Sequence, residues 1–256
     1  MKIVSYNVNG IRAAVTKNFL HWLETLNPDM VCLQEVKALP SQIPDILVAI
    51  EQLGYHHYWF PAEKKGYSGV AILTKVVANH VTYGCGEEWI DKEGRILRAD
   101  FDNFSLMSLY MPSGSSGDER QVKKYAFMKF FQTYIAELKV THPRMIISGD
   151  YNICHTPMDI HNPKTNANSS GFLPEEREWM GMFLDSGFID SFRHFNKDPH
   201  HYTWWSFRAN SRAKNLGWRI DYHLATQALL NDLKNVTILP DAVHSDHCPV
   251  LLELNA

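Results

Sequence analysis

The sequence has few cysteines and no long apolar run, and each shortage excludes a class of protein. Its four cysteines, Cys32, Cys85, Cys154 and Cys248, form no CxxC pair, so a zinc ribbon is not indicated and free buried thiols are expected. No apolar run approaches the roughly 18 residues that a membrane span needs. A strand-like segment, KIVSYNV, begins at residue 2 and leaves no room for a signal peptide. We therefore expect a cytoplasmic protein of bacterial or archaeal type, without a membrane partner.

The chain also lacks an excess of charge of either sign. Its formal net charge is -3 and its sequence pI is about 6.5. A nucleic acid could therefore bind only through a local basic face and metal ions. Hydrophobic residues make up 45% of the 256 residues, which is enough for a sizeable core. We expect one domain spanning residues 1–256, and two similar halves packed together stay possible.

Short strands and helices are mixed along the chain. Residues rich in β-branched and aromatic types predict strands at 2–8, 30–36, 69–75, 95–102, 104–111, 144–150, 219–225 and 250–254. Apolar spacing predicts helices over 19–26, 43–50, 119–140 and 173–187. Between 70 and 111 only strands are predicted, with consecutive strands antiparallel. Without a strict βαβ repeat, this mixture favours α+β layers.

Polar side chains stand at the ends of several predicted strands. The segment MIISGDYNI begins like a buried strand and ends with Asp150 and Asn152, which strand alternation places on one face. A polar strand end running into a turn would explain this pair alone. The pattern recurs, however, at Asn7, Glu35, Tyr110, Asp221, Asp246 and His247. Strand ends of a layered sheet meet at one rim, where a divalent cation would offset the repulsion between carboxylates. Such oxygen-rich ligand sets suit Mg²⁺ or Mn²⁺.

Eight motifs carry a resemblance to a known family. In order they are SYNVNGIR, LQEVK, GYSGVAI, LYMPSG, SGDYNI, GFLPEERE, GWRIDYHL and SDHCPV. They resemble the exonuclease III family of apurinic/apyrimidinic (AP) endonucleases over essentially the whole chain. The wider superfamily, with DNase I, sphingomyelinases and inositol polyphosphate phosphatases, shares only the Asn, Glu, Asp-x-Asn and Asp-His elements.

The resemblance implies a four-layer α/β sandwich, with two mixed β-sheets packed together and flanked by helices. It implies Mg²⁺-dependent hydrolysis, with Mn²⁺ as a substitute, of double-stranded DNA at abasic sites. The cut falls 5′ to the lesion and leaves a 3′-hydroxyl, and 3′-phosphodiesterase and 3′–5′ exonuclease activities accompany it. The family precedent is a monomer.

The same resemblance implies roles at the metal. Glu35 resembles the principal metal ligand, and Asn7 and Asp246 resemble residues of the same coordination shell. Asp150 resembles the group that activates the attacking water, and Asn152 the amide that orients it. Both are also candidate metal ligands.

Phosphate binding is assigned to three further residues. His247 resembles the phosphate-binding imidazole and is a candidate metal ligand as well. Asp221 resembles the carboxylate that orients His247, and Tyr110 the phenol that contacts the phosphate. The chemistry asks for such groups independently, because an imidazolium and a phenol each stabilise the charge that develops in phosphodiester hydrolysis.

A segment rich in aromatic and basic residues, from Tyr202 to Tyr222, is the candidate DNA-binding region. By resemblance Trp204, Trp218 and Ile220 line the pocket for a flipped-out abasic sugar. Ordinary core packing is the alternative for the tryptophans. The candidate DNA-backbone contacts are Arg208, Arg212, Lys214, Asn166 and Arg12, with Arg219 also among the basic residues of the segment. Further candidates for contacts with phosphate or DNA are Lys17, Lys64, Lys65, Asn162 and Lys164. For these residues and for Arg12, exposure to solvent without any DNA contact is the alternative.

The chain departs from the family pattern in four places. Ser113 stands where many members have Asn, and the loop SSGDER lacks the Arg of the human-type enzyme. Arg208 replaces a Met that wedges into the minor groove in that enzyme. A basic insertion typical of the strongly exonucleolytic branch is absent, which favours AP endonuclease over processive exonuclease activity. A superfamily phosphodiesterase or phosphatase acting on a small phosphate ester, and a non-catalytic DNA-binding relative, are the alternative functions.

Overall fold

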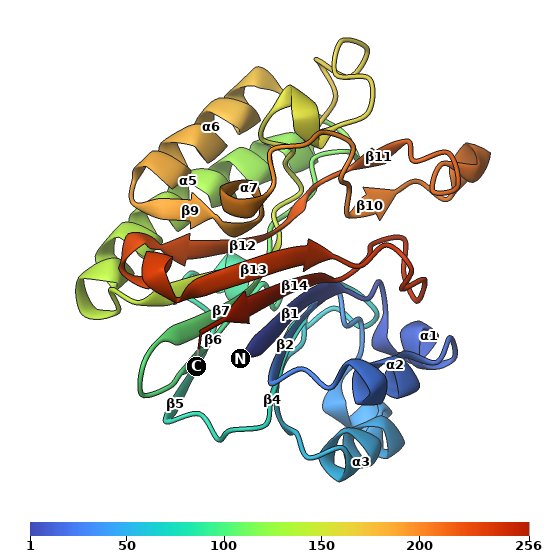
Figure 1. The fold of residues 1–256 in the computed structure, drawn as a ribbon, viewed down its shortest axis with the longest axis vertical. Coiled ribbons are helices and arrows are strands. Elements are labelled where there is room, and N and C mark those ends of the chain that lie inside the picture. Colours follow the sequence, from blue (N-terminus) through green and yellow to red (C-terminus); the bar gives the residue numbers. More distant parts are fainter. Residues whose placement is uncertain (256) are drawn as a thin grey trace.

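The computed structural model describes residues 1–255 and places two six-stranded sheets face to face (Figure 1). The first sheet has the order β13-β14-β1-β2-β4-β3. Its strands are β1 (Lys2–Asn7), β2 (Met30–Gln34), β3 (His56–Phe60), β4 (Val70–Thr74), β13 (Leu233–Ile238) and β14 (Val250–Leu254). Every residue of β2 and β4 is buried. Burial on both faces explains why these strands read as continuous apolar runs rather than as alternating patterns.

The second sheet has the order β5-β6-β7-β8-β12-β9. Its strands are β5 (His80–Tyr83), β6 (Ile96–Asp100), β7 (Ser105–Tyr110), β8 (Met145–Asp150), β9 (Phe188–Asp190) and β12 (Asp221–Thr226). In each sheet the two central strands are parallel and all other neighbours are antiparallel. The two sheets therefore repeat one pairing pattern, which supports the alternative of two similar halves. The single domain stays a prediction.

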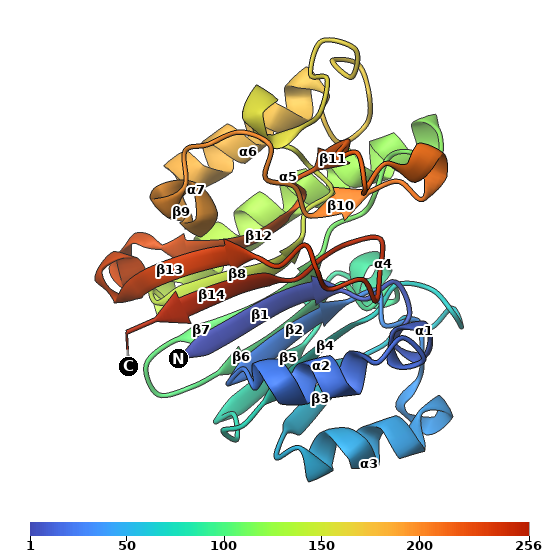
Figure 2. The same ribbon diagram turned by 45° about the vertical axis from the view of Figure 1, so that its right-hand side comes forward.

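Helices cover the outer faces of both sheets (Figures 1 and 2). On the first sheet these are α1 (Ile11–Val15), α2 (Phe19–Leu26) and α3 (Pro44–Gln52), and on the second α5 (Asp118–Thr141) and α6 (Pro174–Asp185). Three large apolar clusters fill the spaces between these layers. The predicted four-layer sandwich is confirmed. Among the described residues no helix is long and apolar enough to cross a membrane.

Several sequence predictions of local structure need correction. The segment 70–111 is not made of strands alone, because α4 (Glu88–Asp91) forms within it. Its strands β4 and β5 do not pair, since they belong to different sheets. The sequence also missed β3, β5, β9 and β13, which are the four edge strands of the two sheets. Edge strands are partly exposed and lack the apolar runs that reveal central strands, as the exposed residues of β5 and β13 illustrate.

The polar ends of the central strands meet at one rim of the sandwich. Asp150 pairs with Tyr110 on one side and with Asp221 on the other. Asn7 ends β1 beside Gln34 at the end of β2. A small separate sheet, β10 (Trp204–Trp205) with β11 (Gly217–Trp218), lies at this rim, and the two chain termini lie at the opposite end (Figures 1 and 2). The short helix α7 (Ser191–Phe195) follows β9.

Candidate active site

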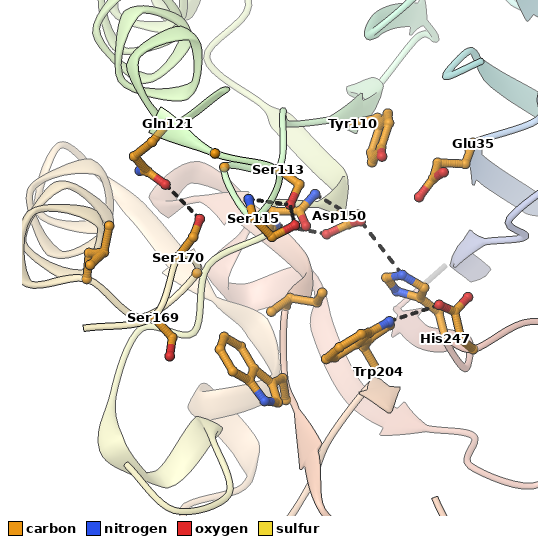
Figure 3. A pocket seen from close by; sticks show the side chains of 18 of the residues that line it. Glu35, Tyr110, Ser113, Ser115, Gln121, Asp150, Ser169, Ser170, Trp204 and His247 are labelled. Carbon is orange, nitrogen blue, oxygen red and sulfur yellow. Dashed lines mark hydrogen bonds and ion pairs between the residues drawn. The ribbon is translucent and has the colours of Figure 1, made fainter. Parts of the chain in front are cut away.

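A cavity of about 780 Å³ opens at this rim. Its lining comes from the strand ends of both sheets, the loop before α5, the segment before α6 and the small sheet. Glu35, Asp150 and His247 lie on one side, whereas Gln121 and Ser170 lie on the other (Figure 3). The cavity therefore has an ionisable side and a side lined by hydroxyl and amide groups.

Asn7 joins the two sheets at the bottom of the ionisable side. Its Nδ2 donates to Glu35 Oε1 and to Asp150 Oδ2, each at 2.9 Å. Asn7 is fully buried and ends β1, while Glu35 directly follows β2 and Asp150 ends β8. An amide between two carboxylates satisfies both without adding charge. The structure therefore brings together three of the predicted residues.

The turn after β8 holds Asp150 and Asn152 together. The backbone N–H of Asn152 donates to Asp150 Oδ1 at 2.8 Å, and its side-chain Nδ2 donates to the carbonyl of Met111 at 2.9 Å. Asn152 has a φ of 52°, in the left-handed region that Asn tolerates better than most residues. This turn explains the Asp-x-Asn spacing, because the first side chain binds the backbone of the second residue.

A histidine and a carboxylate form a buried pair beside Asp150. His247 Nδ1 lies 2.9 Å from Asp221 Oδ2, and His247 Nε2 lies 3.9 Å from Asp150 Oδ2. Burial lowers the pKa of His247, but Asp221 outweighs it and, with Asp150 and Asp246, raises that pKa to about 10. At neutral pH the imidazole is therefore a cation whose Nε2–H faces the cavity. Asp221 Oδ1 is a buried atom with no hydrogen-bond partner among the described residues.

The carboxylates fit an oxygen-preferring divalent cation. One ligand atom each from Glu35, Asp150 and His247 lies within 4.8 Å of the others. Burial and the neighbouring Asp221 raise the pKa of Asp150 to about 7, as expected where carboxylates are crowded and a cation would relieve the repulsion. His247 fits less well as a ligand, because a protonated imidazole has no free lone pair.

Two residues that were not predicted from the sequence, Asn9 and Lys37, bind the carboxylates of Asp246 and Glu35. Asn9 Nδ2 donates to Asp246 Oδ1 at 2.9 Å, and the indole Nε1 of Trp204 donates to Asp246 Oδ2 at 3.0 Å. Lys37 Nζ contacts Glu35 Oε2 at 2.8 Å and also binds Asn9 Oδ1. Although burial opposes it, Lys37 lowers the pKa of Glu35. Asn9 and Lys37 each follow a predicted site residue by two positions, which is the signal that could have revealed them.

Tyr110 is supported from behind by a buried arginine, also missed from the sequence. Arg95, which is 2% exposed, donates to the carbonyl of Tyr110 at 2.9 Å, and its guanidinium lies 4.8 Å from the centre of the Tyr110 ring. It also donates to the hydroxyl of Tyr67 at 2.9 Å. Burial and the Glu35 charge hold the pKa of Tyr110 well above its usual value, so its hydroxyl keeps its proton.

The aromatic wall of the cavity comes from the small sheet. Trp204 and Trp218 are paired across β10 and β11, with ring centres 6.0 Å apart and nearly perpendicular planes. Both are partly exposed and line the cavity together with Ile220. They pack on a separate apolar cluster that contains Cys154, Ile160 and Phe172. Trp205, in contrast, is 3% exposed and belongs to the interior.

Similarity to known proteins agrees with this geometry. The Endonuclease/Exonuclease/phosphatase family matches residues 4–247. The chain belongs to this family. A Bacillus subtilis exodeoxyribonuclease is 42% identical over all of both chains. The Danio rerio "DNA repair nuclease APEX1" is also 42% identical, over 99% of this chain and 82% of that protein. The resemblance to exonuclease III-type AP endonucleases is thereby confirmed.

Solved structures show the same relationship. An AP endonuclease from Archaeoglobus fulgidus superimposes with a TM-score of 0.91 at 27% identity, over all of both chains. A 3′ phosphatase from Neisseria, bound to a product DNA hairpin, superimposes with a TM-score of 0.92 at 27% identity, again over all of both chains. This endonuclease/exonuclease/phosphatase family is metal-dependent, and the group of Glu35, Asp150 and His247 is the candidate metal site in this member.

The structure separates the basic residues of this family member into two kinds. Arg208, Lys214 and Arg12 are exposed, so their predicted DNA contacts stay open. Arg219 is 1% exposed and forms ion pairs with Asp159 and Asp190. Although Arg219 is one of the basic residues of this segment, its charge is neutralised inside the protein, so it does not belong with the exposed basic residues.

Arg212 has all its close contacts within the chain. Its guanidinium donates to the carbonyls of Pro240, Ala242 and Ser245 at 2.7 to 2.9 Å and lies 4.7 Å from the Trp205 ring. It braces the loop that carries Asp246 and His247, and its contact with DNA stays a prediction. Asn166 Nδ2 similarly donates to carbonyls of its own loop, at His161 and Asn162.

The remaining sequence expectations concern residues outside the cavity. All four cysteines are free, and Cys154 and Cys248 are buried as expected. Lys64, Lys65, Asn162 and Lys164 are exposed, and Lys17 donates to the carbonyl of His244 at 3.3 Å.

Proposed function

We propose that this protein is a Mg²⁺-dependent AP endonuclease of DNA repair. It cuts the phosphodiester 5′ to an abasic site in double-stranded DNA and leaves a 3′-hydroxyl. The main support is one observation: the ionisable group around Asp150 and His247 shares a cavity with the aromatic wall of Trp204 and Trp218. The first group suits a phosphate, and the second suits a nucleotide turned out of the duplex.

The residues of the chain divide the work at the phosphate. Asp150, held in place by Asn7, accepts the proton of the attacking water, and the side-chain amide of Asn152 orients that water. The imidazolium of His247, kept charged by Asp221, donates from Nε2 to a non-bridging phosphate oxygen. Tyr110, whose hydroxyl stays protonated, donates a further hydrogen bond to the phosphate.

Glu35, with Asn7, Asp246, Asp150 and Asn152, would hold Mg²⁺, or Mn²⁺ in its place. A divalent cation supplies charge stabilisation for the phosphate and the leaving oxygen when it is bound. Lys37 forms an ion pair with Glu35, Asn9 donates a hydrogen bond to Asp246, and Lys37 also binds Asn9. These contacts hold the two carboxylates in separate positions.

Substrate choice follows from the aromatic wall. An abasic nucleotide is cheap to turn out of the helix because it has no base to unstack or unpair. Trp204, Trp218 and Ile220 would enclose its sugar. Arg208, Lys214 and Arg12 would follow the DNA backbone beside the cavity. We also propose that the protein acts as a monomer and as a single domain, in line with the family precedent.

The test is incubation with a duplex that carries one abasic site, first with Mg²⁺ and then with EDTA. We expect a single nick 5′ to the lesion with a 3′-hydroxyl end, no nick with EDTA, and none in the same duplex without the lesion. Turnover of a phosphoinositide without cleavage of the abasic duplex would favour a superfamily phosphatase instead. Binding without any cleavage would favour a non-catalytic DNA-binding relative.

A second, weaker activity at 3′ ends is also proposed. Two structures of one Neisseria protein of the same fold, NExo, which is described both as a 3′ phosphatase and as a 3′–5′ exonuclease, support it. We expect a tetrahydrofuran-containing duplex to be cut faster than an undamaged recessed 3′ end is shortened. The opposite order would make the protein an exonuclease first. A cytoplasmic location is proposed as well, supported by the four unpaired cysteines.

A further inference from the structure

A buried ion pair lies behind the cavity, outside the predicted catalytic groups. Lys124 of α5 and Glu176 of α6 contact each other, and both side chains are fully buried. Buried lysines and glutamates are rare, since each charge loses its hydration. Helices α5 and α6 already pack through the aromatic rings of Phe131, Trp179 and Phe183. Holding the two helices together therefore does not require this pair.

The remaining contacts of the pair lead to the site instead. Lys124 Nζ donates to the backbone carbonyl of Asn152 at 2.8 Å. Glu176 Oε2 accepts from the backbone N–H groups of Gly171 and Leu173, at 2.6 and 3.0 Å. One side of the pair thus holds the turn that carries the predicted water-orienting amide. The other side holds the cavity wall.

Gly171 is the point where these two regions meet. Its φ is 94°, and a Cβ added there would lie 2.9 Å from the Trp218 ring and 3.1 Å from the carbonyl of Asn152. Its own carbonyl accepts from the N–H of Cys154 at 2.7 Å. The backbone at Gly171 is therefore in close contact with both the aromatic wall and the turn after β8, and a shift of this segment would move both.

The wall has a second tie to the same carboxylate. Gln121 Nε2 donates to Glu176 Oε1 at 3.0 Å, and the hydroxyl of Ser170 donates to Gln121 Oε1 at 2.7 Å (Figure 3). Glu176 thus accepts three hydrogen bonds besides its contact with Lys124, and two of them are from the backbone of the wall. Lys124 neutralises the charge of Glu176 and donates another hydrogen bond to the backbone carbonyl of Asn152.

We propose that Lys124 and Glu176 are positioning residues that set the distance between the water-orienting turn at Asn152 and the sugar-binding wall at Gly171 and Trp218. The proposal rests on the proposed function, because it assumes the roles of Asn152 and Trp218. Lys124 holds the turn at Asn152 and therefore affects kcat, the rate at which bound substrate is cleaved. Glu176 acts through Gly171 on substrate binding and, through Lys124, on the rate.

The experiment compares Lys124→Met, Glu176→Gln and the double variant in steady-state cleavage of a tetrahydrofuran-containing duplex with Mg²⁺. Losing a partner behind an active-site group typically costs roughly 10- to 100-fold in activity. We expect Lys124→Met to lower kcat by about that much with KM within threefold. Glu176→Gln should raise KM as well as lower kcat. The double variant keeps an acceptor for Gly171 and removes both charges, so it should regain melting temperature and KM but not kcat.

Two further measurements separate positioning from general stability. Arg98→Met removes another largely buried ion pair, that of Arg98 with Asp100 in β6, and should lower the melting temperature while leaving kcat and KM unchanged. Amide exchange at Gly171 and Leu173, measured without metal or DNA, should speed up in Glu176→Gln and less in the double variant. If both single variants prove too unstable to assay, the kcat of the double variant tests the proposal, because this variant has no unpaired buried charge and should keep the fold.

The outcomes are distinct. Wild-type kinetics in the double variant, or equal kinetic losses in Arg98→Met, would overturn the positioning role. A wild-type protein that does not cut abasic duplex would overturn the proposed function. In that case the exchange rates at Gly171 and Leu173 still test the tie from Glu176 to the wall, and unchanged rates would refute it.

Discussion

In the first sheet β1 and β2 form the parallel pair, and in the second sheet β7 and β8 hold the same place. Their ends supply matching positions at the rim. Asn7 ends β1 as Tyr110 ends β7, and Glu35 follows β2 as Asp150 ends β8. The catalytic group thus forms at the joint of two similar sheets, each of which provides one carboxylate and one neutral polar group.

The two sheets differ in the segments that come after these strand ends. After β2 the chain returns to its sheet through α3 and β3, and the site gains only Lys37 from the turn. After β8 the chain runs through the cavity wall, α6, β9 and the small sheet before it returns at Asp221. The proposed substrate contacts therefore come mainly from the second half, whereas the two halves each provide one carboxylate of the pair Glu35 and Asp150.

The largest expected effect breaks the matched carboxylates. Asp150→Asn removes the group proposed to activate water and should lower kcat by at least about 100-fold. Its melting temperature without metal should hold or rise, since the pKa of Asp150 is raised and the buried charge is costly. Glu35→Gln should instead lower the melting temperature, because the pKa of Glu35 is lowered by its partners.

Kinetics and thermal melts of both variants check this contrast, with the exposed Asp185→Asn as control. Near-normal turnover in Asp150→Asn would refute the role given to that residue. Equal melting shifts in the two variants would refute the electrostatic difference between the sheets.

The next effect concerns the charge of His247, which the second sheet maintains. The pKa of His247 is about 10, so phosphate binding should weaken as pH rises toward 10 and the imidazole loses its proton. Asp221→Asn removes the main cause of the raised pKa of His247, and it should lower kcat/KM by roughly 10- to 100-fold. It should also move the alkaline limb of the pH profile to lower pH. An alkaline limb that stays in place would show that another group titrates there.

A moderate effect tests a tie between the two sheets. Buried His223 of β12 lies 2.7 Å from Ser148 Oγ and 2.9 Å from the carbonyl of Val250 in the other sheet. Burial lowers its pKa to about 4, whereas an unfolded histidine titrates near 6.5. As the pH falls below 6.5, His223 becomes protonated in the unfolded chain but stays neutral in the folded protein. This difference should lower the free energy of unfolding by about 3 kcal/mol by pH 4.

Urea unfolding in EDTA at pH 7 and pH 4.5 measures that cost. In His223→Gln the decrease in unfolding free energy on acidification should be smaller than in the wild type. The exposed His80→Gln is the control and should follow the wild type. A parallel decrease in all three proteins would contradict the prediction.

The smallest effect concerns the exposed basic residues of the second half. Arg208→Ala and Lys214→Ala should each weaken duplex binding modestly and reduce the slope of log affinity against log salt by about 1, with kcat unchanged. Lys129→Ala, on exposed α5 surface, should change neither. A salt slope equal to that of the wild type would remove either residue from the interface.

The central strands and the residues at their ends could be predicted because both leave local signals. MIISGD and MVCLQ are apolar runs that stop abruptly at polar groups. The edge strands, and partners such as Arg95 and Lys124, leave no such signal, because their importance depends on contacts with distant segments. Arg219 shows another limit of the sequence. A basic residue between aromatic residues suggests a DNA contact, and nothing nearby in the sequence indicates that Asp159 and Asp190 bind it inside the protein.

Those two aspartates connect the small sheet, through Arg219, to the rest of the protein. Arg219 directly follows β11 and locks it onto the loop before α6 and onto the end of β9. The tryptophans proposed to bind the lesion are therefore fixed to a buried group of ion pairs, and Trp204 is also joined to Asp246 by a hydrogen bond. A change of substrate preference made in β10 would consequently alter the proposed metal site as well, so the shape of the cavity and its chemistry are expected to evolve together.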